Sequence, residues 1–289
     1  MITNRVATVL LKRKKDLIFQ EKETNAPSVE DIHETGGYDP AFFDQLARIE
    51  NQHFWFRARN DLILALVRRI SSSLNPCNLM LEVGCGTGNV LRALEAACPN
   101  CNLIGLELWF EGLKHARGKS HALLIQADIR HLPFGKQFDL VGMFDVLEHI
   151  NEDRETLNAI HSALRPGGKV LLTVPAHRAL WSYFDEAASH CRRYSADGIR
   201  RKLEDSGFEV ELLTQFMASI FPVVWAYRKL NLPRNAVQSA HDRARDEFRL
   251  VPIVNGFLTG LLRLEAKWVG RGHSLPIGTS LVVVARKIA

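Results

Sequence analysis

Three glycines alternate with other residues in the segment LEVGCGTGNV, residues 81–90. Each glycine costs backbone entropy on folding, so this spacing indicates a turn that a ligand approaches closely. Dinucleotide-binding turns have the spacing G-x-G-x-x-G, but Asn89 stands where the last glycine would be. The carboxylate of Glu82 precedes the turn and would repel a pyrophosphate. The segment therefore predicts a ligand that carries positive charge.

A second group of reactive side chains, Asp145, Glu148 and His149, follows the apolar run at residues 138–145. A histidine titrates near neutrality and suits the removal of a proton, so His149 is a candidate catalytic base. The alternative is that His149 only orders the loop or caps the next helix.

A third group lies in the segment DEAASHCRRY, residues 185–194. Arg192, Arg193 and Tyr194 could clamp a carboxylate or a phosphate, since guanidinium binds such groups bidentately. The alternative is a lid in which these arginines pair with the acidic residues that open the segment. His190 is the second candidate for a catalytic role.

Short apolar runs alternate with helix-like stretches along the chain. The predicted strands are residues 78–84, 102–108, 122–128, 138–145, 169–175, 208–214 and 279–287. This alternation predicts a doubly wound α/β sheet that binds its ligand beyond the carboxyl ends of the strands. Helical periodicity from Ala41 to Asn75 predicts helices before the sheet. Asn151 and Ser195 are expected helix caps, and Gly167 an expected helix end.

The glycine segment resembles motif I of class I S-adenosylmethionine-dependent methyltransferases. The segments LIGLEL, QADIRHLPF, FDLVGMFDVLEHI and LRPGGKVLLTVP match further motifs of that family in the right order, over about residues 50–215. The segments HFWFRARN, DVLEHI and LWSYFDEAASHCRRYS resemble the branch that includes ubiquinone-type and other small-molecule methyltransferases. The resemblance implies a Rossmann-like seven-stranded sheet of order 3-2-1-4-5-7-6, with the last strand antiparallel.

The same resemblance implies a cofactor, S-adenosylmethionine, which leaves as S-adenosylhomocysteine. Glu107 would accept the ribose hydroxyls, Asp128 would meet the adenine amino group, and Ile129 would pack on the adenine ring. The full set of expected cofactor-binding residues is Glu82, Gly84, Cys85, Gly86, Gly88, Asn89, Glu107, Leu108, Asp128, Ile129, Phe144 and Asp145. Arg57 and Arg59 are candidates for contacting the methionine carboxylate.

The acceptor is expected to be a small molecule or lipid-like, methylated at the oxygen of a phenol or carboxylate. His149 and His190 are the expected catalytic residues. The expected acceptor-binding residues are Trp55, Trp181, Arg192, Arg193 and Tyr194. Some methyltransferases hold a divalent metal with an acid-x-x-acid-His motif, but no further ligand among His131, His177 and His190 is compelling, so we predict no metal. The alternative function is a non-catalytic module that binds the cofactor or assembles with other proteins.

The 289 residues carry a formal charge of +5 with five cysteines. The odd cysteine count predicts free thiols in a reducing cytoplasm, and the scattered basic residues argue against nucleic acid as a partner. We expect a flexible arm at residues 1–38 and one domain at 39–289, with a helical insertion at about 215–278. The insertion would complete the core, form a homodimer contact or touch a membrane surface, and the protein would be a monomer or homodimer.

Overall fold

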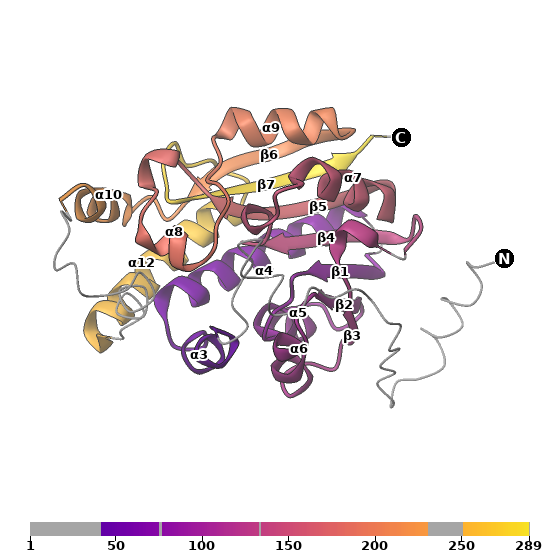
Figure 1. Ribbon diagram of the computed structural model, residues 1–289, viewed down its shortest axis with the longest axis horizontal. Helices are drawn as coiled ribbons and strands as arrows, with labels where there is room; N and C mark the ends of the chain where they lie inside the picture. The colour runs from indigo at the N-terminus through magenta and orange to yellow at the C-terminus, as the bar shows by residue number, and fades with distance from the viewer. Residues whose placement is uncertain (1–41, 75–76, 133, 231–250, 289) are drawn as a thin grey trace.

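The computed structural model describes residues 42–74, 77–132, 134–230 and 251–288. A mixed seven-stranded sheet runs through the molecule (Figure 1). Its strands are β1 (Leu79–Val83), β2 (Asn102–Glu107), β3 (Leu123–Gln126), β4 (Phe138–Phe144), β5 (Leu164–Pro175), β6 (Phe208–Phe216) and β7 (Ser280–Lys287). Each predicted strand corresponds to one of these. The inner strands β4 and β7 are buried almost throughout, as strands covered on both faces are, whereas the edge strands β3 and β6 are partly exposed.

The strand order is β3-β2-β1-β4-β5-β7-β6, as the resemblance implied. Strands β1 to β5 pair in parallel, whereas β7 is antiparallel to both β5 and β6. The chain reverses its direction of winding between β1 and β4, which are neighbours in the sheet. A crevice forms at such a switch point, beyond the carboxyl ends of the strands.

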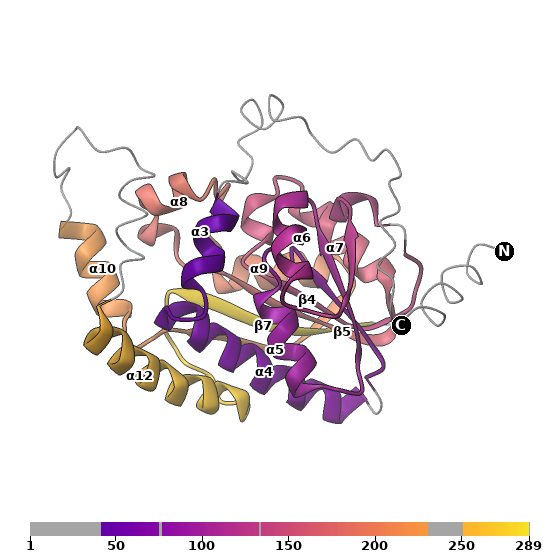
Figure 2. The same cartoon turned by 90° about the horizontal axis from the view of Figure 1, so that it is seen from below.

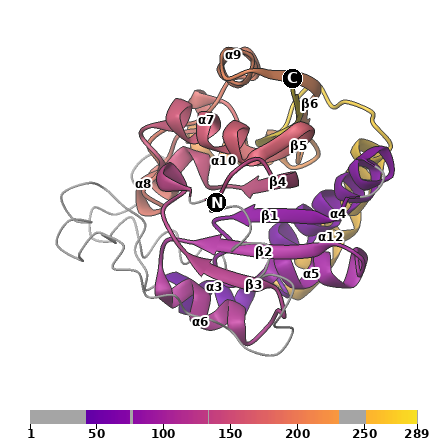
Figure 3. The same ribbon diagram turned by 90° about the vertical axis from the view of Figure 1, so that its right-hand side faces the viewer.

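Helices cover both faces of the sheet (Figures 2 and 3). One hydrophobic cluster joins the sheet to α4 (Phe54–Leu74), α5 (Asn89–Ala97), α6 (Phe110–Arg117) and α12 (Pro252–Gly270). A second cluster joins the opposite face to α7 (Asp153–Ala163) and α9 (Ala196–Asp205). The remaining elements are the helices α3 (Phe42–Ile49), α8 (Tyr183–Ala187) and α10 (Phe221–Leu230) and the short 3-10 turns η1 (Ile129–His131), η2 (Leu147–His149) and η3 (Arg178–Leu180). Ile129 of η1 and Leu147 of η2 belong to the second cluster, and Val224 of α10 packs against the first.

Local boundaries differ from the prediction at three places. The periodic stretch from Ala41 splits into α3 and α4 at a polar turn, residues 50–53. The side-chain carboxylate of Glu50 in this turn accepts hydrogen bonds from Thr87 and Lys119. Helix α7 begins after Glu152 rather than Asn151. That helix ends at Ala163, and the expected stop, Gly167, lies within β5 with a φ of +74°.

The predicted insertion contains α10 and α12. Helix α12 packs along α4, and Gly270 at its end faces Ala65 of α4. No helix among the described residues is both long enough and apolar enough to cross a bilayer. The predicted arm at residues 1–38 lies outside the described residues. The five cysteines are free thiols, as predicted.

Candidate functional site

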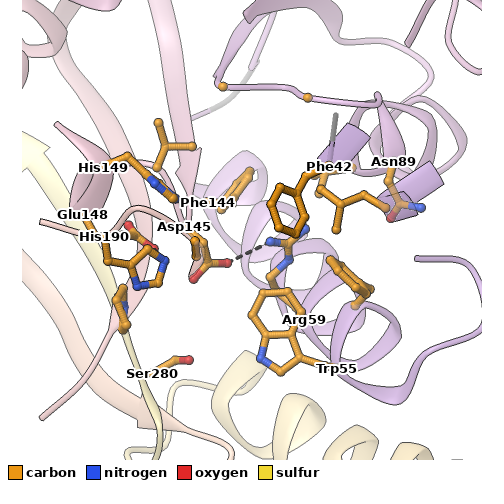
Figure 4. A pocket seen from close by; sticks show the side chains of 18 of the residues that line it. Phe42, Trp55, Arg59, Asn89, Phe144, Asp145, Glu148, His149, His190 and Ser280 are labelled. Carbon is orange, nitrogen blue, oxygen red and sulfur yellow. Dashed lines mark hydrogen bonds and ion pairs between the residues drawn. The ribbon is translucent and has the colours of Figure 1, made fainter. Parts of the chain in front are cut away.

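A cavity of about 810 Å³ opens at the carboxyl ends of β1, β2 and β4. Its size lies within the ~300–1,000 Å³ typical of sites for small ligands. The glycine turn, the residues that follow β2 and β3, and the end of β4 form one side, which we call the cofactor side. The start of α4 together with α3, η2, α8, α10 and the segment after α8 forms the other, which we call the acceptor side. Figure 4 shows side chains from both sides pointing into the same space.

The glycine turn after β1 forms the floor of the cofactor side. Gly84, Gly86 and Gly88 all have left-handed backbones, with φ of +67°, +51° and +75°. A Cβ at Gly84 would lie 2.4 Å from Val146, and one at Gly88 would lie 2.8 Å from the backbone of Ala116 in α6. The alternate glycines are therefore required by backbone conformation and by close packing. Gly88 holds α5 against α6 and is not among the residues that line the cavity.

Glu107 at the end of β2 ties the glycine turn to the neighbouring strand. One carboxylate oxygen accepts from the Gly86 amide at 2.9 Å, and the other accepts from the Trp109 amide at 3.0 Å. Burial raises the pKa of this carboxyl, and the backbone hydrogen bonds oppose that rise. Each oxygen keeps further lone pairs on the cavity wall, so the carboxylate can also accept from a ligand hydroxyl.

Glu82 lies beneath the turn, 3% exposed. Burial raises the pKa of its carboxyl well above the ordinary value, while the positive charge of Arg59 opposes that rise. Its Oε2 has no hydrogen-bond partner among the described residues. A buried acceptor of this kind is costly unless it is paired, so the site favours a ligand that brings a cation or a donor to Glu82.

The other residues expected on the cofactor side also lie around the cavity. Those that line it are Cys85, Asn89, Leu108, Asp128, Ile129, Phe144 and Asp145. Asp128 begins η1 and accepts from the amide and guanidinium of Arg130. The Asn89 side chain bonds Asn60 of α4 and the turn at residue 51, so it fixes the glycine turn to the helix beneath it. Eleven of the twelve residues expected to bind the cofactor therefore line one cavity.

An ion pair spans the boundary between the two sides. Arg59 of α4 bonds Asp145 at 2.8 Å, and its guanidinium lies 4.8 Å from the ring centroid of Trp55 (Figure 4). Asp145 has a φ of +56°, a conformation that non-glycine residues rarely adopt. Such strained residues cluster at functional sites, where the surrounding structure holds them.

Glu148, His149 and His190 gather beside Asp145 on the acceptor side (Figure 4). The rings of His149 and His190 meet edge to face, with centroids 4.8 Å apart. Burial and the neighbouring His190 lower the pKa of His149 to about 3. Its imidazole is therefore neutral near pH 7 and is a weak proton acceptor. Burial and the charge of Asp145 raise the pKa of Glu148 well above its ordinary value.

Asp185 of α8 anchors the segment that carries His190. It is fully buried, and it accepts from the His190 ring at 2.9 Å and from Arg193 at 2.6 Å. Burial alone would raise the pKa of this carboxyl, but those two bonds outweigh it and lower the pKa below the ordinary value. Arg193 therefore belongs to the predicted salt-bridged lid, although it also borders the cavity.

Trp181, Arg192 and Tyr194, three of the five residues expected to bind the acceptor, do not line this cavity. Arg192 pairs with Asp153 at 2.7 Å, and the hydroxyl of Tyr194 donates to the same carboxylate at 3.0 Å. These two side chains hold α7 against the segment after α8. Trp55 and Arg193 remain on the wall. Of the alternative histidines, His177 bonds Gln215, and the side chain of His131 lies outside what the structure describes.

Sequence reasoning missed the contribution of α10 to the acceptor side. Val223, Val224 and Tyr227 of this helix line the cavity, and Val223 is 70% exposed. Their apolar character was visible in the sequence, but nothing in it placed α10 over the cavity. Asn255 of α12 was also missed. Its side chain accepts from the Phe54 amide at 2.7 Å and donates to the Gln52 carbonyl at 2.9 Å, which fixes the start of α4.

Comparison with known proteins gives one family. Residues 51–213 match the sequence model of a family described as a methyltransferase domain. A probable S-adenosylmethionine-dependent methyltransferase of Mycolicibacterium smegmatis is 27% identical over 171 residues, 56% of this chain and 62% of its own length. A ubiquinone biosynthesis O-methyltransferase of Erwinia tasmaniensis is 30% identical over 103 residues, 32% of this chain and 41% of its own length.

Among solved structures, the methyltransferase in a complex with the Haloferax volcanii Trm112 methyltransferase activator superposes with a TM-score of 0.54. The match covers 86% of this chain and 98% of that one, at 17% sequence identity. At this level of sequence identity, the likeness shows that the two chains share a fold. The matched segments span between two-fifths and about three-fifths of the curated relatives' own lengths.

Proposed function

We propose that this chain, which belongs to the methyltransferase-domain family, transfers a methyl group from S-adenosylmethionine to the oxygen of a small, apolar or lipid-like acceptor. In that reaction the bond from the methyl carbon to sulfur breaks as a bond to the acceptor oxygen forms. S-adenosylhomocysteine leaves as a neutral thioether, and the acceptor hydroxyl gives up its proton. An ionised carboxylate acceptor would need no proton transfer.

The observation that carries the proposal is the set of carboxylates around the glycine turn. Glu82 and Glu107 are buried at the ends of neighbouring strands, and each presents acceptor oxygens to one cavity. A sulfonium nucleoside with an ammonium group and two ribose hydroxyls matches these acceptors. A nucleotide phosphate would be repelled by the same carboxylates.

The acceptor side supports an apolar methyl acceptor. Trp55 and the α10 residues Val223 and Val224 contribute apolar surface to the wall. Outside the cavity lining, Trp225 of α10 and Phe257 of α12 are 47% and 69% exposed. A face of this kind fits peripheral contact with a lipid surface from which an acceptor could enter.

Methylation at oxygen is favoured by the polar cluster of Glu148, His149 and His190. These groups stand on the wall of the acceptor side, beside Asp145, where an acceptor hydroxyl could meet the methyl group. We assign both histidines to the acceptor oxygen. Because the pKa of His149 is about 3, its ring does not take up a second proton near neutrality.

The test begins with protein from which carried-over ligand has been removed. We expect calorimetry to show binding of S-adenosylmethionine and S-adenosylhomocysteine. We also expect a panel of phenols and carboxylates, some with isoprenoid or acyl tails, to release S-adenosylhomocysteine on turnover. Cofactor binding without turnover on any acceptor would favour the non-catalytic module, and the absence of cofactor binding would refute both functions.

A further inference from the structure

Three potential metal ligands converge on the acceptor side of the cavity. Glu148 and His149 come from η2 after β4, and His190 comes from the segment after α8, 41 residues along the chain from His149. One ligand atom from each lies within 4.8 Å of the others. Figure 4 shows the three side chains facing a common space next to Asp145.

His190 is oriented as metal-binding histidines are. Its Nδ1 lies 2.9 Å from Oδ1 of Asp185, which is fully buried. An ionised carboxylate can only accept hydrogen bonds, so with Asp185 ionised Nδ1 carries the proton. The lone pair is then on Nε2, which lies 3.9 Å from Oε1 of Glu148. That separation is too long for a hydrogen bond. Metal-binding histidines usually donate a hydrogen bond from one ring nitrogen to a carboxylate and bind the metal with the other.

Glu148 supplies an independent observation. Its side chain is 1% exposed, and its Oε2 has no hydrogen-bond partner among the residues that the structure describes. Burying a carboxylate oxygen without a partner costs free energy, so folded proteins pair such atoms with donors or cations. The neighbouring ligand atoms are imidazole nitrogens, which makes a shared cation the natural partner.

We propose that Glu148, His149 and His190 bind one divalent first-row transition ion of the Zn²⁺ class at the acceptor side of the cavity. Two imidazoles and one carboxylate favour Zn²⁺, Co²⁺ or Fe²⁺ over Mg²⁺ or Ca²⁺, which take oxygen ligands. Ligand atoms about 2.0–2.2 Å from one ion lie roughly 3–4 Å from each other, so small side-chain rotations complete the site. This replaces the expectation of no metal.

Three protein ligands leave at least one coordination position open, and the open side faces the cavity. On the proposed function, an acceptor hydroxyl would occupy that position. A bound ion lowers the pKa of a hydroxyl that coordinates it. Ion binding itself does not depend on the methyl acceptor or on turnover.

The experiment uses the untagged full-length chain after chelator treatment, with neither cofactor nor acceptor present. Equilibrium dialysis against Zn²⁺ should give one ion per chain, and titration with Co²⁺ should produce visible d–d absorption. His190→Ala and Glu148→Gln should each weaken the affinity for Zn²⁺ by at least ~10–100-fold, the cost typical of losing even an outer partner. Both should abolish the Co²⁺ band.

His121→Ala is the matched control, because that ring is fully exposed and should leave ion binding unchanged. Binding of S-adenosylhomocysteine by each variant reports that the fold is intact, and Glu148→Gln keeps the shape of the side chain if His190→Ala does not fold. Wild-type protein that binds no ion, or folded variants that bind it as tightly as wild type, would overturn the proposal. Ion binding without any methyl transfer would support this site and count against the proposed function alone.

Discussion

The cofactor side and the acceptor side of the cavity are built in different ways. On the cofactor side, a 66-residue stretch from β1 to the end of β4 supplies the floor (residues 79–144), and backbone amides contribute many of its hydrogen bonds. On the acceptor side, the wall is assembled from α3 and the start of α4 together with η2, α8 and α10, which come much later in the chain. The first construction depends on backbone conformation, and the second on tertiary packing.

This difference indicates which part of the cavity tolerates substitutions. A turn defined by three left-handed glycines tolerates few substitutions, since added Cβ atoms at two of them would meet Val146 or Ala116. Side chains on α10 meet fewer constraints, because that helix is largely exposed. We therefore expect cofactor binding to be fixed by the fold, and acceptor choice to be set by a replaceable wall.

Gly88→Ala in the glycine turn should have the largest effect on stability and on cofactor binding. The added methyl would lie 2.8 Å from the Ala116 backbone at a φ of +75°. We expect a loss of about 2–4 kcal/mol in the free energy of unfolding. Calorimetry should detect no S-adenosylhomocysteine binding. Gly260→Ala is the control, because a Cβ there meets nothing within 4 Å in α12. It should stabilise the protein by about 0.5–1 kcal/mol in denaturant unfolding.

Glu107→Ala should weaken cofactor binding by roughly 10–100-fold, since it removes a charge-assisted acceptor where we propose that the ribose binds and leaves the Gly86 amide without its acceptor. Calorimetric titration with S-adenosylhomocysteine measures the change. The exposed Glu111 on the adjacent helix provides the matched variant, Glu111→Ala, which should bind normally. Equal affinities for wild type and Glu107→Ala would remove the basis for the cofactor assignment.

Trp55→Ala tests the acceptor side separately. We expect the KM for an acceptor to rise about 5–10-fold, because burial of one aromatic ring against a ligand contributes roughly 1–1.5 kcal/mol. The affinity for S-adenosylhomocysteine should stay within about twofold, a change of ~0.4 kcal/mol. Trp181→Ala removes a tryptophan that does not line the cavity and should leave both quantities unchanged. If Trp55→Ala weakened cofactor binding more than acceptor binding, the division into two sides would be wrong.

Glu82→Gln should have the smallest effect on binding, a roughly 3–10-fold loss of affinity for the cationic cofactor. Without ligand it should stabilise the protein, because burial raises the pKa of the Glu82 carboxyl. A carboxyl with a raised folded pKa contributes stability below its unfolded pKa, about 4.3, and loses it as pH rises through the folded value. The variant's advantage should therefore grow from acid to neutral pH. Unfolding curves at several pH values measure it, and an advantage that shrank with rising pH would contradict the assignment.

The strand pattern and the cofactor side could be predicted from the sequence because both depend on local features. Three local patterns made this possible, and each spans only a few residues: apolar runs of strand length, alternate glycines, and acidic residues at strand ends. The acceptor side could not be predicted in the same way. Tyr194 and Arg192 look like ligand-binding residues, but the carboxylate they contact is Asp153. The proximity of His190 to Glu148 depends on how α8 packs, which no local pattern encodes.

The hydrogen bonds from Asn255 to residues 52 and 54 have a consequence for synthesis on the ribosome. A nascent chain has its glycine turn and strands β1 to β4 once residue 144 has emerged. The hydrogen bonds that fix the start of α4, where Trp55 lies, can form only after α12 has been made, more than a hundred residues later. We therefore expect the acceptor side to gain its anchor only after the glycine turn has been synthesised.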